Sequence, residues 1–350
     1  MKVTAKMIAE ELGISTATVD RVLNNRKGVS EKTIRRVKAK AKEMGYRPNT
    51  AAKFLATQKR TEVAFILPVF PEYFWDEIES EINAASELYK DFGFVAHVHR
   101  VNAIPDKIRL DYFKKIIKNN PYDALVIAPH DSTPFIDVIN EGINKGIPIF
   151  TINNDVPESK RIFYVGGDYY SAGYLAAEII YLFSKKLKDV VIIRDEDNTF
   201  QMINKEKGFR EYFHQNRINV NIHTVCTNGW DSQLGGDKII KTLSSTDAIY
   251  VASGILGEVA EYIDDHIHGG NRIVVGHDMS KEIYFYLQKN IINSIICQDP
   301  ASQAFLTVKN VFEYLVLGER HINSETIIKL EIVTKANAKY YINFEKSPKK

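Results

Sequence analysis

The sequence predicts a small all-helical domain followed by an α/β body that folds into two lobes with parallel sheets. In the first 60 residues, apolar side chains recur at helical spacing; beyond them, short apolar runs alternate with amphipathic stretches. Charge changes at the same point, because residues 1–60 carry 15 Lys and Arg against 5 Asp and Glu, and the other 290 residues carry 31 against 39. A hydrophobic content of 45% over 350 residues is enough for more than one core.

The first residues predict a helix-turn-helix. Thr4 has a side-chain oxygen suited to the N-cap of a first helix, and Ser15 suits the start of a second. Gly13 permits the tight turn between them, since glycine takes a positive φ without steric cost. The expected core residues of the two helices are Ile8, Ala9, Leu12, Ile14, Val19 and Val22. A unit of this kind lays its second helix in the DNA major groove.

A third helix is predicted from about Glu31 to Met44, where Gly45 ends it. It carries most of the basic charge of this domain, on Lys32, Arg35, Arg36, Lys38, Lys40 and Lys42. A basic run alone is more often a solvated face than a binding surface. Its coincidence with helix-turn-helix spacing favours DNA, because Lys and Arg neutralise phosphates and release counterions.

The runs "VTAKMIAEELGISTATVDRVLN" and "VSEKTIRRVKAKAKEMGYRPNTAAKFL" resemble the amino-terminal DNA-binding domain of the lactose/galactose repressor (LacI/GalR) family. The resemblance covers about 55 residues and includes the T-V-x-R-V-L-N run, the G-Y-x-P-N step and the A-K-x-L segment. The contacts to DNA that it implies come from Thr4, Ser15, Thr16, Ala17, Thr18, Arg21, Asn24, Asn49, Ala52, Lys53 and Leu55.

The resemblance also implies a hinge at residues 48–60, which folds into a short helix only when a dimer sits on its operator. Leu55 would then wedge into a central base step from the minor groove and kink the duplex. The alternative is an ordinary linker leucine. The preceding Pro48-Asn49 step favours the hinge, because it matches the family motif.

Asp20 departs from the family pattern, in which a serine usually bonds a phosphate at this position. A carboxylate repels phosphate unless it pairs locally, and Arg26 and Lys27 follow closely in the sequence. We therefore expect Asp20 to form a structural ion pair. Direct acceptance from cytosine N4 is the alternative.

Continuous apolar runs in the rest of the chain predict buried strands at Val63–Leu67, Phe94–Val98, Ala124–Ala128, Ile147–Ile152, Val190–Ile193, Val220–Val225, Ala248–Ala252, Ile273–Val275 and Ser294–Cys297. Amphipathic stretches between them predict helices that include Glu77–Tyr89, Phe135–Lys145, Tyr174–Lys185 and Ile255–Asp265. Such strands form parallel sheets covered on both faces. Two successive sets predict two lobes, with a ligand cleft where the carboxyl ends of the strands face each other.

The body resembles its counterpart in the same family and in the related periplasmic sugar-binding proteins, over roughly residues 61–335. Motifs that carry the likeness include "GIPIFTINND", "VGGDYYSAGYLAAEII" and "SIICQDPASQA". The expected domains are a helix-turn-helix domain at 1–47, a hinge at 48–60 and an effector-binding body at 61–345, with lobe 1 at about 61–160 plus 295–320 and lobe 2 at about 161–292 plus 321–345.

Sugar recognition needs flat apolar faces and rigid polar groups. On the resemblance, the candidate effector contacts are Phe74, Trp75, Asp131, Asn153, Lys205, Trp230, Ser253, Asp278 and Gln298. Some have a structural alternative: Phe74 suits a core position, and Asp131 and Asp278 suit helix starts. Trp230 follows Gly229 in a polar stretch, which favours a ligand wall over a core position.

Two positions depart from what many relatives carry. Ser253-Gly254 stands in place of Asn-Asp, and Lys205 stands in place of Arg. Serine cannot bond two hydroxyls at once, and lysine lacks the planar fork of arginine. These departures predict a larger, modified or acidic sugar, and the charge of Lys205 makes an anionic group the sharper form of that expectation.

Other functions find less support. Residues 166–173 are glycine-rich but lack the strand–GxGxxG–helix arrangement of a nucleotide site. His130 and His277 have no partners at metal-ligand spacing, so neither a metal nor a cofactor is expected. Cys226 and Cys297 suit a reducing cytoplasm, and no apolar signal core or membrane-spanning run of about 20 residues is present.

The sequence therefore predicts a dimeric, cytoplasmic transcription regulator, usually a repressor. Its partners would be double-stranded operator DNA and a small-molecule effector, a sugar or sugar derivative. One alternative is a regulator controlled by a protein co-regulator, with no small ligand. Another is a two-lobed enzyme with Asp131 and Asp278 as paired carboxylates, which leaves the basic head unexplained.

Overall fold

The computed structural model describes residues 3–23, 26–46, 60–101, 106–129, 132–184, 186–196, 198–227, 242–267, 272–320 and 324–342. The chain divides into a helical head and a larger body that begins at Thr61. Of the predicted site residues, those outside the described ranges are Asn24, Asn49, Ala52, Lys53, Leu55, Asp131 and Trp230. Within the described ranges, no helix has the length and apolarity needed to cross a membrane.

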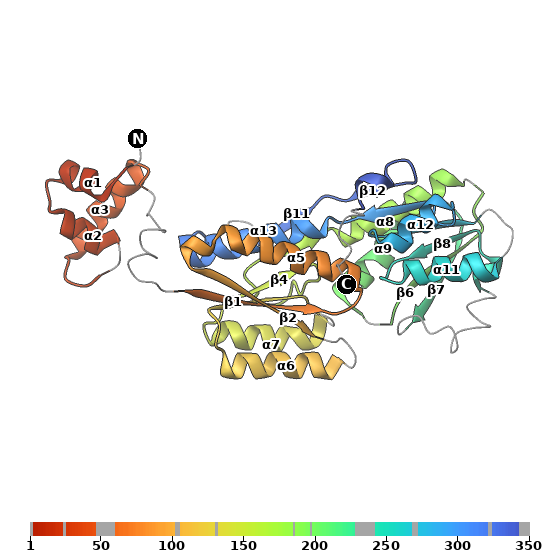
Figure 1. The fold of residues 1–350 in the computed structure, drawn as a ribbon, viewed down its shortest axis with the longest axis horizontal. Helices are drawn as coiled ribbons and strands as arrows, with labels where there is room; N and C mark the ends of the chain where they lie inside the picture. Colours follow the sequence, from red (N-terminus) through yellow and green to blue (C-terminus); the bar gives the residue numbers. More distant parts are fainter. Residues whose placement is uncertain are drawn as a thin grey trace, which may run out of the picture. The chain divides into compact units, whose positions relative to one another are not determined.

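The head consists of α1 (Ala5–Leu12), α2 (Thr16–Leu23) and α3 (Glu31–Glu43), as predicted (Figure 1). The Thr4 side chain accepts a hydrogen bond from the Met7 amide at 3.3 Å, and Gly13 ends α1 with a φ of 63°. The side chains that hold the three helices together are buried and apolar: Ile8, Ala9, Val19, Val22, Val37 and Ala41. The predicted turn and four of the six predicted core residues are confirmed, and the other two, Leu12 and Ile14, are partly buried against the same core.

The first lobe is built on a six-stranded parallel sheet with the order β11-β5-β4-β3-β1-β2. Its strands are β1 (Thr61–Pro68), β2 (Phe94–Val101), β3 (Ala124–Ile127), β4 (Ile149–Ile152), β5 (Tyr164–Gly167) and β11 (Glu325–Ile328). Helices α6 (Asp106–Asn119) and α7 (Ser132–Asn144) cover one face; α5 (Glu72–Leu88) and α13 (Pro300–Phe312) pack together over the other (Figure 1).

The second lobe repeats this architecture with the order β12-β10-β9-β8-β6-β7, in which β12 alone runs antiparallel to its neighbour. Its strands are β6 (Asp189–Asp195), β7 (Asn221–Thr227), β8 (Ala248–Val251), β9 (Ile273–His277), β10 (Ser294–Cys297) and β12 (Glu331–Val333). Helices α8 (Tyr169–Phe183) and α9 (Phe200–Gln215) cover one face, and α11 (Leu256–His266) and α12 (Lys281–Gln288) cover the other. Three further short helices occur elsewhere in the described residues, at Lys90–Phe92, Glu313–Leu317 and Ala338–Tyr340.

The predicted lobe boundaries need correction. Residues 164–167, expected at the start of lobe 2, form β5 in the first sheet, where Thr151 of β4 pairs with Tyr164. Ser294–Cys297 was expected at the edge of lobe 1, but it forms β10 in the second sheet. Residues 325–328, expected in lobe 2, form β11 of the first sheet. Hydrogen-bonding partners distant in sequence decide the lobe to which each strand belongs.

In the described residues the chain passes between the lobes at three places. Asp168 joins β5 to α8, Gln298 and Asp299 join β10 to α13, and residues 329–330 join β11 to β12. Side chains from these connections approach one another: a methyl group on Gly167 would lie 3.8 Å from Oε1 of Gln298 and 3.7 Å from the Leu330 side chain. The connections between the lobes therefore lie close to one another.

Candidate functional site

The outer face of the head presents the residues predicted to read DNA. The Ser15 hydroxyl accepts from the Thr18 amide at 3.1 Å and lies 2.8 Å from the Thr18 hydroxyl, so both side chains help to start α2. Thr16, Ala17 and Arg21 are exposed on the same helix. Thr16 and Ala17 lie at the start of α2 and Arg21 lies in its last turn, so the exposed side chains extend along the helix.

Asp20 pairs with Arg26, with 3.4 Å between the carboxylate and the guanidinium, which confirms the expected ion pair. Both side chains are about half exposed or more, so the pair adds little stability. The pair places a positive charge beside the Asp20 carboxylate.

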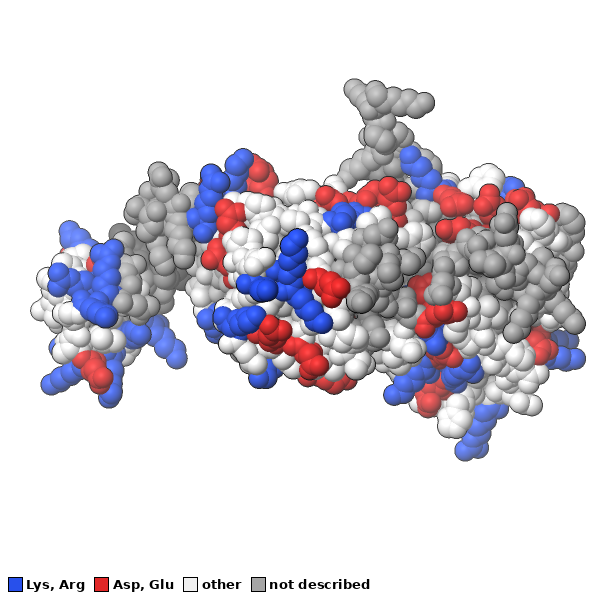
Figure 2. Space-filling view, turned by 90° about the horizontal axis from the view of Figure 1, so that it is seen from below, with Lys and Arg blue, Asp and Glu red and all other residues white. Residues whose placement is uncertain are grey.

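Figure 2 shows Lys and Arg side chains distributed over the head with few acids among them, whereas both signs are interspersed over the visible face of the body. This distribution matches the charge counts of the two parts of the sequence. The head therefore carries the electrostatic field suited to a polyanion such as DNA.

In the body, predicted effector residues lie at the carboxyl ends of strands. Asn153 follows β4, Ser253 follows β8 and Asp278 follows β9, while Gln298 follows β10. Asn153 and Asp278 adopt positive φ values of 62° and 61°. Non-glycine residues hold this conformation only where the surroundings fix it, and such residues cluster at functional sites. Hydrogen bonds join three of them, Asn153, Asp278 and Gln298.

Gln298 connects the two lobes through its side-chain amide. Its Nε2 donates to Oδ2 of Asp278 at 2.9 Å, and its Oε1 accepts from Nδ2 of Asn153 at 3.2 Å. The Tyr169 hydroxyl also donates to Oε1, at 3.1 Å. Because Gln298 lies in a chain crossing, any shift of Asp278 relative to Asn153 strains these bonds.

Two buried tyrosines that were not predicted from the sequence also belong to this network. The hydroxyls of Tyr164 and Tyr169 both donate to the carbonyl of Asn153, at 2.8 Å and 2.5 Å. Gln303 on α13 is also buried, accepts from Asn153 and donates to the backbone of Gln298. A sequence signal for Tyr169 is its position directly after Asp168, whose side chain caps α8.

Lys205 on α9 is buried, with only 2% of its surface exposed. Its ammonium donates to the carbonyl of Ala252 at 2.9 Å and lies 5.6 Å from the centre of the Tyr169 ring. Burial lowers the pKa of Lys205 from 10.5 to about 8, although Asp278 and Asp195 favour its charged form.

Asp278 and its neighbour His277 complete the electrostatics of the site. Burial raises the pKa of Asp278, and the nearby Lys205 ammonium opposes this rise. Burial and the charge of Lys205 together hold the pKa of His277 well below 6.5, and its Nε2 lies 2.7 Å from the Tyr250 hydroxyl. Because His277 is neutral, Lys205 and Asp278 are the two groups of opposite charge in this part of the site.

The shift at Lys205 predicts a pH dependence of stability. The folded chain releases this proton near pH 8 and the unfolded chain near 10.5, so between these values the unfolded state binds more protons. The free energy of unfolding should therefore rise across this window relative to that of Lys205→Met. Urea unfolding of both proteins at several pH values measures it. Lys207→Met, an exposed lysine on the same helix, should keep the rise; a rise retained in Lys205→Met contradicts the assignment.

Phe74 and Trp75 lie in the first turn of α5 and are each only 4% exposed. Their rings meet edge to face, with centroids 5.3 Å apart. The Trp75 indole N–H donates to the carbonyl of Phe70 at 3.1 Å, so it fixes the loop that follows β1. Both aromatic side chains are therefore buried packing residues at the start of α5.

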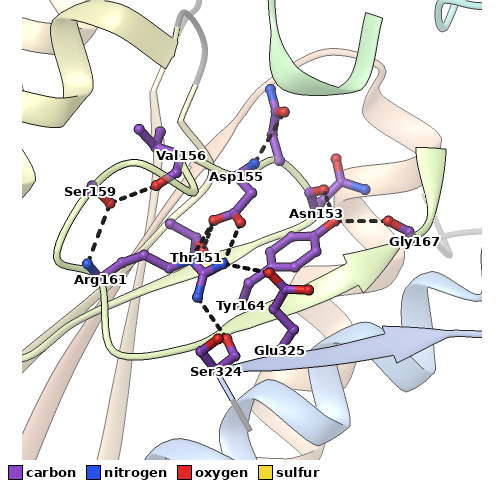
Figure 3. Close-up of polar contacts among 11 residues, drawn as sticks. Thr151, Asn153, Asp155, Val156, Ser159, Arg161, Tyr164, Gly167, Ser324 and Glu325 are labelled. Atoms are coloured by element: carbon purple, nitrogen blue, oxygen red, sulfur yellow. Dashed lines mark hydrogen bonds and ion pairs between the residues drawn. The ribbon is translucent and has the colours of Figure 1, made fainter. Parts of the chain in front are cut away.

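A buried ion pair fixes the loop that carries Asn153 (Figure 3). The Arg161 guanidinium donates to both carboxylate oxygens of Asp155, at 2.7 Å and 2.6 Å, and these side chains are 5% and 1% exposed. Arg161 also donates to the carbonyl of Ser324, and Asp155 accepts from the Thr151 hydroxyl. The loop between β4 and β5 is thereby tied to the edge strand β11.

No group of three His, Cys, Asp or Glu side chains suited to a metal ion occurs in the part of the chain that the structure describes. Glycines at the crossing of α8 and α9 are more informative about the site. A Cβ on Gly173 would overlap the backbone carbonyl oxygen of Lys205, and a Cβ on Gly208 would overlap that of Tyr170. Two glycines therefore let the helices approach closely enough to hold Lys205 beneath β8.

Comparison with known protein families agrees with both parts of the chain. Residues 63–320 match the family described as periplasmic binding protein domain, and residues 4–49 match the family described as bacterial regulatory proteins, lacI family. The chain belongs to the lacI family of bacterial regulatory proteins. It is a DNA-binding transcriptional regulator with a periplasmic-binding-protein body, as the head and the two lobes indicate.

Individual relatives support this assignment. The HTH-type transcriptional regulator DegA of Bacillus subtilis is 26% identical over 73% of this chain and 74% of its own length. The sucrose operon repressor of Streptococcus mutans is 26% identical over 59% of this chain and 61% of its own. The glucose-galactose binding protein GanP of Geobacillus stearothermophilus shares the fold, with a TM-score of 0.71 at 23% identity over 80% of this chain and 99% of that one.

Proposed function

We propose that this regulator is a repressor whose affinity for operator DNA is controlled by a sugar or sugar derivative bound between the two lobes. The observation that carries the proposal is a set of polar residues between the lobes: Asn153, Ser253, Asp278 and Gln298 follow strand ends, and the Lys205 side chain on α9 reaches the Ala252 carbonyl after β8. Ligand sites hold a small number of precisely placed polar groups of this kind in otherwise apolar surroundings. The sugar-related names of its relatives agree with this chemistry.

The proposed coupling runs through the chain connections between the two lobes. An effector that binds the closed arrangement more tightly than the open one shifts the population toward closure, by as much as its two affinities differ. Gln298 contacts Asp278 on the second lobe and Asn153 on the first. A movement of one lobe relative to the other therefore alters these two hydrogen bonds. Altered spacing of the two hinge segments at residues 48–60 of a homodimer then changes operator affinity.

The surroundings of Lys205 favour a neutral effector over the acidic one suggested by the sequence. Its ammonium donates to Ala252, and Asp278 acts on it as the main opposing charge. A ligand carboxylate would compete with Asp278 for Lys205 and be repelled by it. We also propose that the protein works in the cytoplasm, without catalysis or cofactor; its relatives DegA and the sucrose repressor are regulators.

A screen of the full-length protein tests the effector. The melting temperature is measured with D-glucose, D-galactose, sucrose, maltose and the acidic D-galacturonate. We expect a neutral sugar to raise it and to change the affinity for an operator selected from random DNA. A protein that binds none of them and responds only to a protein partner would favour control by a co-regulator instead.

Leu55→Ala tests the hinge assigned to residues 48–60. The change removes an apolar wedge but no phosphate contact, so binding to the selected operator should weaken by at least about tenfold while binding to random DNA stays nearly unchanged. Fluorescence anisotropy over a range of salt concentrations measures both. Lys53→Ala is the matched control and should lower the salt slope by about 0.9. Equal losses of Leu55→Ala on both DNAs would remove the wedge role.

A further inference from the structure

Two histidines lie on β2, the edge strand of the first sheet, and neither is among the predicted effector residues. β1 and β2 pair so that Ala64 lies beside His97 and Ile66 lies beside His99. Ala64 and Ile66 belong to the apolar core under α6 and α7, so both histidines face that side of the sheet. Polar side chains from β1, from α6 and from the segment before β3 meet them there.

His97 has a carboxylate as its partner. Its Nε2 forms a hydrogen bond with Oε2 of Glu62, and the two side chains are 40% and 31% exposed. Glu62 is fixed in turn, because its amide donates to Oδ2 of Asp123 at 2.9 Å and its carbonyl accepts from the Asp123 amide at 2.8 Å. A protonated His97 forms a charge-assisted bond with this carboxylate, so the site accommodates a positive charge on His97.

His99 is held instead by two tyrosine hydroxyls. Its Nε2 lies 2.9 Å from the Tyr122 hydroxyl, and its Nδ1 lies 3.2 Å from the Tyr112 hydroxyl. Tyr112 belongs to α6 and Tyr122 lies in the segment before β3, so the His99 ring joins α6 to the sheet. A neutral imidazole suits this position, because it offers one N–H donor and one nitrogen acceptor to the two hydroxyls.

A positive charge on His99 is unfavourable in these surroundings. Both ring nitrogens would donate, so the hydroxyl that donates to the neutral ring would have to turn away. Burial is the main cause that lowers the pKa of His99 below 6.5, and the charge of His97 lowers it further. The two histidines therefore differ in their response to acid, although they lie two residues apart on one strand.

We propose that His97 and His99 form an acid-sensitive switch that attaches α6 to the first sheet. At neutral pH, an uncharged His99 bonds both tyrosines. As the pH falls, His97 takes up a proton beside Glu62, and its charge opposes a second proton on His99. Further acidification charges His99 as well; the charged ring needs water, and α6 loosens from the sheet as water reaches it.

The direction of the pH dependence follows from the lowered pKa of His99. Between that pKa and 6.5, the unfolded chain binds more protons than the folded chain at this residue. The free energy of unfolding therefore falls as the pH is lowered through this range, and the contribution of a neutral His99 is fully present above 6.5. In His99→Gln, the side-chain amide keeps a donor and an acceptor but does not titrate, so this part of the pH dependence should vanish.

Urea unfolding of the full-length wild type and of His99→Gln, at pH 7 and at pH 5, measures the switch. On acidification, the unfolding equilibrium constant of the wild type should grow by about threefold or more beyond that of the variant. His223→Gln is the matched control, because His223 lies on the edge strand β7 of the second lobe and its side chain is 62% exposed. It should follow the wild type. Equal pH dependence in the wild type and His99→Gln overturns the proposal.

Two further measurements test the switch without relying on the folding of His99→Gln. Exchange of the ring C2 hydrogen, followed by mass spectrometry for each histidine, should give His99 a midpoint below 6.5 that rises in His97→Gln. Backbone hydrogen exchange, corrected for its intrinsic pH dependence, should accelerate in α6 at pH 5 while α9 stays protected. A His99 midpoint at or above 6.5, a midpoint unchanged in His97→Gln, or an α6 equally protected at both pH values contradicts the switch.

Discussion

Replacing Gly173 with alanine is expected to destabilise the body by about 3 kcal/mol or more, although the same change in an ordinary helix stabilises by up to about 1 kcal/mol. The added Cβ would overlap the backbone carbonyl of Lys205, which no side-chain rotation relieves. Helices α8 and α9 must therefore move apart, and their shared core with Phe209 and Tyr212 loosens. Urea unfolding monitored by circular dichroism measures the loss.

Gly257→Ala in α11 is the matched control for this change. Its Cβ would meet Oε2 of Glu282 at 2.6 Å, but that atom is the end of a flexible side chain that can swing away. We expect its effect to stay within about 1 kcal/mol. A similar, small effect of Gly173→Ala would show that the crossing of α8 and α9 is looser than the structure has it.

Arg161→Ala should destabilise the first lobe by about 3–5 kcal/mol, the usual result of leaving a buried charge without its partner. Asp155 is 1% exposed and would lose both bonds to the guanidinium, and the Ser324 carbonyl would lose one of its two donors (Figure 3). The loop from β4 to β5, which begins at Asn153, would then detach from β11. Chemical unfolding gives the stability, and effector affinity should fall with it.

Glu325→Ala separates the buried pair from its exposed extension. Glu325 lies 3.3 Å from the same guanidinium, but its side chain is 49% exposed. Its removal should cost less than about 1 kcal/mol. If both variants lose the same amount, the stabilisation comes from the cluster as a whole and the buried pair has no special weight.

Local sequence patterns are sufficient to predict the helices and the turn of the head. Thr4, Gly13 and Ser15 act within three or four residues of their own position, and the structure confirms each cap and turn. The apolar runs of the body also predict its strands, because strands buried on both faces need continuous apolar residues. Each run predicted to be a strand is one.

Residues 164–167 show where such patterns fail. Two of these four residues are glycines, and four residues show no periodicity, so the sequence did not predict a strand here. It became strand β5 because β4 on one side and β11 on the other supply hydrogen-bond partners. The correction of the lobe boundaries follows from the same cause.

By itself, the sequence determined the division into a basic head and an acidic body, the helix-turn-helix, the α/β class and which polar residues end the strands. These properties depend on neighbours within a turn or a strand. Only the tertiary structure decided that Gln298 bonds Asn153, 145 positions away, and that Tyr73 on α5 packs against the core of the second lobe. Both depend on how two lobes meet, and that contact follows from the shapes of surfaces that the chain assembles from distant segments.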